Sequence, residues 1–201
     1  TPSVEVVRVP MEYWEALRHR DPVALCENSL ARPFPPDGFL LRFLGKDLLV
    51  DLEHLCLRHE LGGRWERFRK PVIELVCLVY LLNAGPEALS QEMVSVEGLK
   101  DAQFFHGPHE LMVQPLLDRY ADDLGGFKGA AEDLDGEILE LADVAYRLWA
   151  LPKIPIYYLF WEGDEEFEAR LSILFDRSIE YHLSADAIWG LVNSVSHILV
   201  V

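Results

Sequence analysis

Residues 152–176, with the sequence PKIPIYYLFWEGDEEFEARLSILFD, hold the clearest fold signal in this chain. The run from Ile154 to Trp161 is apolar at both alternating sets of positions and is rich in β-branched and aromatic side chains. Such a run is typical of a strand that is buried on both faces of a sheet. A short acidic turn follows, and a second apolar-rich run, roughly Arg170 to Phe175, carries the chain back. We therefore predict an interior strand paired antiparallel with this second run.

The composition predicts one acidic globular domain. The 201 residues, half of them hydrophobic, suffice for one sizeable core and leave little room for two. A net charge of −16, from 18 basic and 34 acidic residues, repels phosphate backbones and anionic lipid headgroups. Nucleic acid and membrane surfaces are therefore poor partners. The longest apolar windows also fall short of the roughly 20 residues that a membrane span needs.

Cysteine usage and the N-terminal segment indicate a cytoplasmic protein. Cys26, Cys56 and Cys77 are widely spaced and form no CxxC pair. We expect three reduced thiols and no cysteine-based metal site, and no cofactor is evident. The first residues carry too many charges for a signal peptide, and we treat residues 1–10 as a flexible or truncated segment.

Strand and helix signals alternate along the chain and predict an α+β fold, with a mainly antiparallel sheet of about four to six strands covered by helices. We expect a hairpin from residues 39–44 and 48–57, with His54 on the apolar side of its second strand. Helices are expected over residues 11–30 (split at Asp21-Pro22), 71–82, 110–120, the stretch between Gly126 and Gly136, and 185–199 with Ser184 as cap.

Four blocks of sequence resemble a family of domains of unknown function. They are FPPDGFLLRFLG at 34–45, FFHGPHEL at 104–111, residues 151–179 around WEGDEEF and LFD, and LSADAIW at 183–189. The family occurs mainly in anaerobic bacteria and archaea, sometimes alone and sometimes behind a small iron–sulfur domain. The resemblance spans about residues 11–199 and implies a role in anaerobic metabolism. This chain lacks a cluster-binding cysteine motif, so no iron–sulfur cluster is implied, and no catalytic residue carries over.

The acidic turn is the first candidate site. Its closely spaced carboxylates can coordinate a hard cation, and the flanking aromatic rings can raise a carboxyl pKa by desolvation. The turn lacks the spacing of a calcium loop, however, and a charge run is more often a hydrated hairpin tip. Asp176, at the end of the second strand, caps the next segment, pairs with an arginine or lies in a cleft. The candidate ligand-binding residues are Trp161, Asp164, Glu165, Glu166 and Asp176.

The segment HGPHE at residues 106–110 is the second candidate, because it offers potential metal ligands. These are His106, His109 and Glu110. The i, i+3 spacing of the imidazoles and the intervening Gly-Pro exclude the continuous helix of an HExxH site. A loop can still bring the two rings together. The simpler interpretation makes His109 and Glu110 the first turn of the next helix.

Three classes of function stay open at this point. We expect first an accessory domain that binds a small molecule or a protein partner in anaerobic metabolism. The second class is a carboxylate-based or metal-assisted enzyme, which requires the turn at 161–167 and the loop at 106–110 to converge in one cleft. The third is a purely structural interaction module, which requires an exposed apolar patch.

Overall fold

Two antiparallel sheets and six α-helices make up the part of the chain that the computed structural model describes, residues 8–201. The α+β prediction is confirmed. The expectation of a single sheet is wrong, because a long helix between residues 71 and 83 separates two sets of hairpins into two sheets of five strands each. Within the described residues, no helix is both long and apolar enough to cross a membrane.

The N-terminal half is a meander in which each strand pairs with the next along the chain. Gly45, Gly62 and Gly63 adopt φ values of +78°, +57° and +78°, which glycine accepts without strain, and these turns allow tight hairpins. The elements are α1 (Met11–Arg18), α2 (Pro22–Ser29), β1 (Arg32–Pro33), β2 (Gly38–Phe43), β3 (Lys46–Asp51), β4 (Cys56–Leu61), β5 (Arg64–Arg67) and α3 (Pro71–Asn83).

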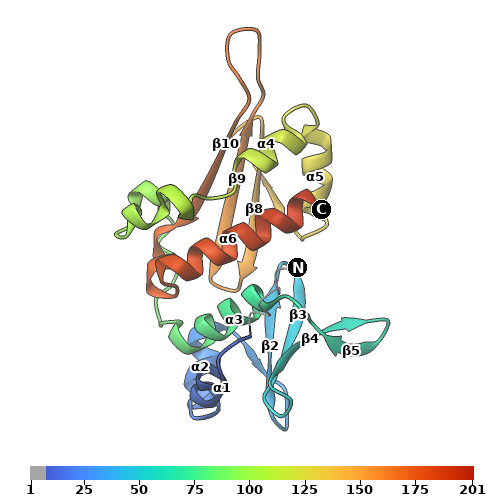
Figure 1. Ribbon diagram of the computed structural model, residues 1–201, viewed down its shortest axis with the longest axis vertical. Coiled ribbons are helices and arrows are strands. Elements are labelled where there is room, and N and C mark those ends of the chain that lie inside the picture. The colour runs from blue at the N-terminus through green and yellow to red at the C-terminus, as the bar shows by residue number, and fades with distance from the viewer. Residues whose placement is uncertain (1–7) are drawn as a thin grey trace, which may run out of the picture.

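The C-terminal half builds its sheet in the order β6-β10-β9-β8-β7. Three helices lie across one face of this sheet, as Figure 1 shows. The strands are β6 (Met93–Val94), β7 (Glu137–Leu139), β8 (Val144–Leu151), β9 (Ile154–Trp161) and β10 (Arg170–Asp176). The helices are α4 (Gln114–Tyr120), α5 (Leu124–Glu132) and α6 (Ala185–Val200), with 3-10 turns η1 (Val96–Gly98), η2 (Ala102–Phe105), η3 (Gly107–His109) and η4 (Arg177–Tyr181).

The predicted interior strand is confirmed. β9 is the middle strand and pairs antiparallel with β10, with Tyr158 opposite Ile173. Every residue of β9 except Trp161 is buried. One face packs into the main core beneath the helices, and the other carries a smaller apolar cluster centred on Tyr157 and Leu159. Apolar residues on both faces of β9 therefore reflect two separate clusters.

A single main core runs through both halves of the molecule. It includes the buried faces of α3 and α6, which lie against each other where the two halves meet. A backbone hydrogen bond from Leu44 N to Trp149 O, 3.2 Å long, also joins the turn after β2 to β8. On the α6 side of the C-terminal sheet, the hydroxyls of Tyr158 and Ser196 lie 2.8 Å apart.

Several helix boundaries follow from capping and from proline. The split at Asp21 is confirmed, since its carboxylate accepts from the amides that begin α2. The helix expected from residue 110 begins instead at Gln114, because proline is tolerated in a first turn and Pro115 lies there. α5 begins at Leu124, before Gly125 and Gly126, because Asp123 caps it. Ser184 occupies the cap position of α6, but its hydroxyl donates to Asp186.

The placement of His54 on an apolar strand face is wrong. β3 ends at Asp51, whose carboxylate accepts hydrogen bonds from the amides of Glu53 and His54 at 3.0 and 2.9 Å. These bonds turn the chain into the β3–β4 connection, and the side chain of His54 is 58% exposed. A carboxylate that captures nearby amides competes with the strand ladder.

Candidate functional site

A hollow of about 430 Å³ lies between the start of α1, the end of β5 and the start of α3. We call it the basic pocket, because four cations and one carboxylate line it among residues 8–201. Its lining residues are Arg8, Val9, Met11, Trp14, Leu55, Arg67, Phe68, Arg69, Lys70, Pro71 and Glu74.

The local sequence explains how the cations reach this place. Gly62-Gly63 closes the β4–β5 hairpin, so that Arg67 pairs with Arg58 in the strand register. The amide of Phe68 donates to Leu57 O at 2.9 Å, which extends the attachment by one residue past the strand. Arg69 and Lys70 then form the short connection into α3. Arg8 comes from the segment before α1, so the pocket joins residues that are far apart in sequence.

Within residues 8–201, Glu74 is the carboxylate that lines the pocket beside the four cations. Across residues 8–201 none of these cations takes part in an ion pair, although the same region contains six arginine–carboxylate pairs elsewhere. Arginine and lysine at such density bind carboxylate or phosphate oxygens through charge-assisted hydrogen bonds. The pocket is therefore locally positive in a chain whose net charge is −16.

The N-terminus of α3 adds to this positive character. Its cap residue is Lys70, which makes no side-chain cap, and Pro71 begins the helix. The first helical hydrogen bond runs from Glu74 N to Lys70 O, so the amides of Val72 and Ile73 precede the intrahelical ladder. First-turn amides lack intrahelical acceptors, and together with the helix dipole they favour an anion at this end.

The basic pocket also contains a half-buried carboxylate, Glu74, and apolar side chains. Burial raises the pKa of the Glu74 carboxyl, against the opposing effects of the Leu57 amide and the Arg67 charge. The buried ring of Trp14 and the half-buried Phe68 supply apolar surface. A ligand that suits this lining has an anionic group and an apolar or aromatic body.

The structure places the acidic turn at the tip of the β9–β10 hairpin, which projects beyond the helices in Figure 1. Asp164 Oδ1 accepts from the amides of Glu166 and Phe167, both at 2.8 Å, so its charge holds the turn. Phe167 is 69% exposed and supplies little desolvation. Glu165 and Glu166 are exposed, and Trp161 packs under Arg170, whose guanidinium carbon lies 4.3 Å from the ring centroid.

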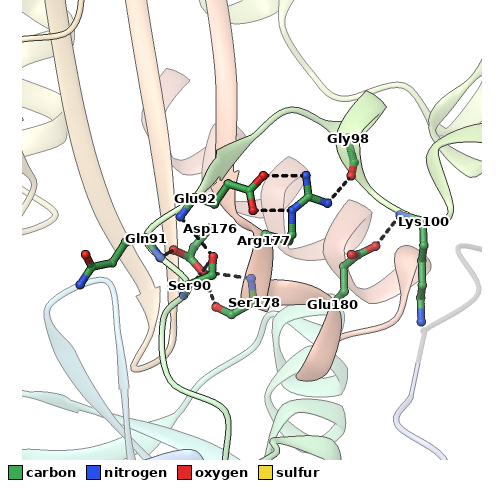
Figure 2. A network of polar contacts seen from close by, with 9 residues as sticks. All are labelled: Ser90, Gln91, Glu92, Gly98, Lys100, Asp176, Arg177, Ser178 and Glu180. Atoms are coloured by element: carbon green, nitrogen blue, oxygen red, sulfur yellow. Dashed lines mark hydrogen bonds and ion pairs between the residues drawn. The ribbon is translucent and has the colours of Figure 1, made fainter.

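Asp176 lies at the other end of β10, in the polar network of Figure 2. Its side chain is buried and accepts from the amide and hydroxyl of Ser90, the amide of Gln91, and the amide and hydroxyl of Ser178. Burial alone would raise the pKa of Asp176, but the hydrogen bonds from Ser178 and Ser90 outweigh it and hold the pKa below its usual range. The capping interpretation is confirmed, since Asp176 is the N-cap of η4.

The histidine loop lies against α6. The ring of His109 stacks on Phe104 with centroids 4.2 Å apart and lies perpendicular to the ring of Trp189. Trp189 Nε1 donates to the carbonyl of Glu110 at 3.3 Å. His106 Nε2 lies 3.6 Å from a carboxylate oxygen of Glu97. His109 and Glu110 do not form a helical first turn, because α4 begins four residues later.

The two candidate segments have different neighbours. The hollow beside the acidic turn is lined by the turn itself and by Ala121, Asp122 and Leu124, between α4 and α5. Neither His106 nor His109 lines it. Residues 8–201 contain no group of three or more histidines, cysteines, aspartates or glutamates arranged to hold a metal ion.

The basic pocket was missed by reasoning from the sequence, although a signal was present. RWERFRK at residues 64–70 contains four basic residues in seven, in a chain with 18 basic residues among 201. That density contrasts with the acidic composition and was a local clue. The contribution of Arg8 and Trp14 carries no such signal, because only the fold brings them to the same hollow.

A family model described as a domain of unknown function, DUF3786, matches residues 21–197. The chain belongs to the DUF3786 family. The sequence resemblance to such a family is thereby confirmed. The DUF3786 match includes the pocket residues from Leu55 to Glu74, whereas those from Arg8 to Trp14 precede it. Searches of curated proteins and of solved structures each found no match.

Proposed function

We propose that this DUF3786 domain binds a small organic anion, a carboxylate or phosphate ester with an apolar body, in the basic pocket. The observation that carries the proposal is the convergence of four cations without an ion pair among residues 8–201. All four cationic residues are exposed around the hollow, so they are accessible to form charge-assisted hydrogen bonds with a bound anion.

The charge of the whole chain makes this arrangement selective. A net charge of −16 weakens non-specific attraction of anions, so binding depends on the local geometry of the pocket. Arg67 and Arg69 offer planar forks that match carboxylate and phosphate oxygens. The volume of about 430 Å³ lies within the usual range of small-molecule sites.

The proposal favours a binding domain over an enzyme. The pocket supplies cations, apolar surface and one half-buried carboxylate, which suit recognition of a ligand. A role in anaerobic metabolism and a cytoplasmic location, which the family resemblance and the composition imply, are part of the proposal. An organic anion of intermediary metabolism would fit that setting.

Direct binding measurements test the proposal. Isothermal titration calorimetry at low salt would compare inorganic phosphate, aliphatic mono- and dicarboxylates, and aromatic carboxylates and phosphate esters. We expect the amphipathic anions to bind more tightly than phosphate alone, and added salt to weaken their binding. The proposal is wrong if no member of the panel binds at millimolar concentration.

A matched pair of double variants locates the site. Arg67→Gln with Arg69→Gln removes two charges from the pocket, and Arg64→Gln with Arg20→Gln removes two exposed charges outside it. We expect the first pair of substitutions to weaken binding roughly 10- to 100-fold and the second to change it little. Equal losses in both variants would show a long-range charge effect and would overturn the assignment to this pocket.

A further inference from the structure

The segment at residues 84–92 connects α3 to β6 and so joins the two halves of the molecule. Side chains of the C-terminal half hold it at two points. His182 and Lys153 bind its beginning, at Gly85 and Glu87, and Asp176 binds its end, at Ser90 and Gln91. The two points differ in the chemistry of the groups that hold them.

His182 holds the first point as a neutral acceptor. The residue is 1% exposed, and its Nδ1 accepts from the amide of Gly85 at 3.1 Å. Because that amide is a donor, Nδ1 is unprotonated and the ring proton lies on Nε2. Lys153 Nζ donates to Gly85 O at 2.9 Å and to Glu87 O at 3.4 Å. His182 Nε2 and Glu87 Oε2 are both buried without a hydrogen-bond partner among residues 8–201.

Protonation of His182 is incompatible with this arrangement. The imidazolium has two donors, so Nδ1 would direct a proton at the Gly85 N–H. The added charge would be buried and would face the ammonium of Lys153 from the β8–β9 turn. The carboxylates of Glu87 and Asp176 and the backbone of Glu87 act in the opposite direction, but burial and Lys153 prevail and lower the pKa of His182 below its usual value.

The second point is insensitive to the same change. Asp176 accepts five hydrogen bonds and its pKa is lowered, so it stays charged in the range where histidine titrates. The Arg177 side chain also donates to Glu92 and to the Gly98 carbonyl beside it, as drawn in Figure 2. The segment is thus anchored at residues 90–92 whatever the state of His182.

We propose that His182 is a proton-operated latch that releases the Gly85–Glu87 end of this segment on acidification, while the Asp176 end stays attached. In the released form His182 reaches solvent and regains its ordinary pKa, near 6.5. The released form therefore binds a proton more readily than the latched form does. Acidification below about pH 6.5 shifts the equilibrium toward release.

Hydrogen exchange of individual amides tests the latch. The protection factor of the Gly85 amide, corrected for the intrinsic exchange rate, would be followed from about pH 7.5 to about pH 4.5. If release is coupled to the uptake of one proton, the protection factor of the Gly85 amide should fall by up to about tenfold per pH unit below about pH 6.5. The amides of Ser90 and Gln91, which bind Asp176, should keep their protection.

Two variants and one spectroscopic measurement complete the test. His182→Asn keeps an acceptor near the Nδ1 position and cannot titrate, so the fall at Gly85 should disappear, whereas His197→Asn, at an exposed position of α6, should retain it. Nitrogen-15 NMR of His182 in the wild-type protein should show the Nε2–H tautomer at neutral pH, whatever the folding of the variant. A flat Gly85 profile, an unchanged profile in His182→Asn, or an Nδ1–H tautomer would each overturn the proposal.

Discussion

The two ends of β10 show opposite uses of carboxylates. At the Arg170 end the hairpin tip carries four acidic residues between positions 162 and 166, exposed to solvent. At the other end a single carboxylate, Asp176, is buried and accepts five hydrogen bonds. The sequence draws attention to the tip, but the structure concentrates its interactions on Asp176.

The burial of a carboxylate and its hydrogen-bond donors, more than the local density of charge, account for the difference between Asp176 and the hairpin tip. A hydrated carboxylate is solvated equally in the folded and unfolded chain, so it contributes little to folding. A buried carboxylate with matched donors is different, because removing it leaves those donors unpaired. The comparison therefore predicts a steep order of mutational effects along one strand.

The largest effect is expected for Asp176→Ala. This change removes the buried carboxylate and leaves the buried amide and hydroxyl of Ser178, and the donors of the exposed residues Ser90 and Gln91, without their acceptor. We expect a loss of about 3 kcal/mol in the free energy of unfolding. Urea unfolding followed by tryptophan fluorescence measures it. A loss below about 1 kcal/mol would break the comparison.

The next effect is a pH dependence that belongs to Asp176. The pKa of Asp176 is lowered in the folded protein. Its contribution to the free energy of unfolding is therefore complete above the pKa of the unfolded state, near 3.9, and is lost as the pH falls through the pKa of the folded state. Unfolding measured from about pH 5 to about pH 2 should show this loss in the wild type. Asp176→Asn should be less stable at neutral pH and should have a shallower acid slope. Equal slopes would contradict the assignment.

A smaller effect is expected for Asp164→Ala at the tip. Asp164 accepts from two backbone amides of an exposed turn, so its loss should reduce stability by about 1 kcal/mol. The neighbouring Glu166→Ala is the control, because no side-chain hydrogen bond of Glu166 is formed within residues 8–201. Equal destabilisation by both changes would mean that the turn is not held by Asp164.

The smallest effect is expected for Glu165→Gln combined with Glu166→Gln. Both side chains are exposed, and such substitutions usually change stability by no more than about 0.5 kcal/mol. Thermal unfolding with and without Ca²⁺ or Mg²⁺ measures this and tests the cation site at the same time. Stabilisation of the wild type, but not of the variant, by either cation would restore the acidic turn as a site.

Much of the fold could be predicted from local pattern. The apolar run of β9 specified an interior strand, Asp21-Pro22 specified a helix boundary, and Gly45 marked a hairpin turn. Two predicted element boundaries were wrong because an aspartate side chain accepts hydrogen bonds from nearby backbone amides. Asp51 ended a strand early and moved His54 into a turn, and Asp123 started α5 ahead of its glycines.

The candidate sites were less predictable. The sequence offered a cap as one of the alternatives for Asp176 and marked the acidic turn, and both lie at the ends of β10 as expected. It gave no sign that the amides bound to Asp176 come from residues 90 and 91, more than 80 positions earlier. Reasoning from the sequence also missed the density of basic residues between Arg64 and Lys70.

The sequence by itself determined the α+β class, the central position of β9 and the acidic character of the chain, because each depends on composition or on local periodicity. Only the tertiary structure decided which charged groups are paired, buried or left free. Arg8 and Arg67 line the same pocket, and His182 accepts a hydrogen bond from Gly85 in the segment that connects the two halves. Desolvation and hydrogen bonding, which set the chemistry of these groups, depend on neighbours that are distant in sequence.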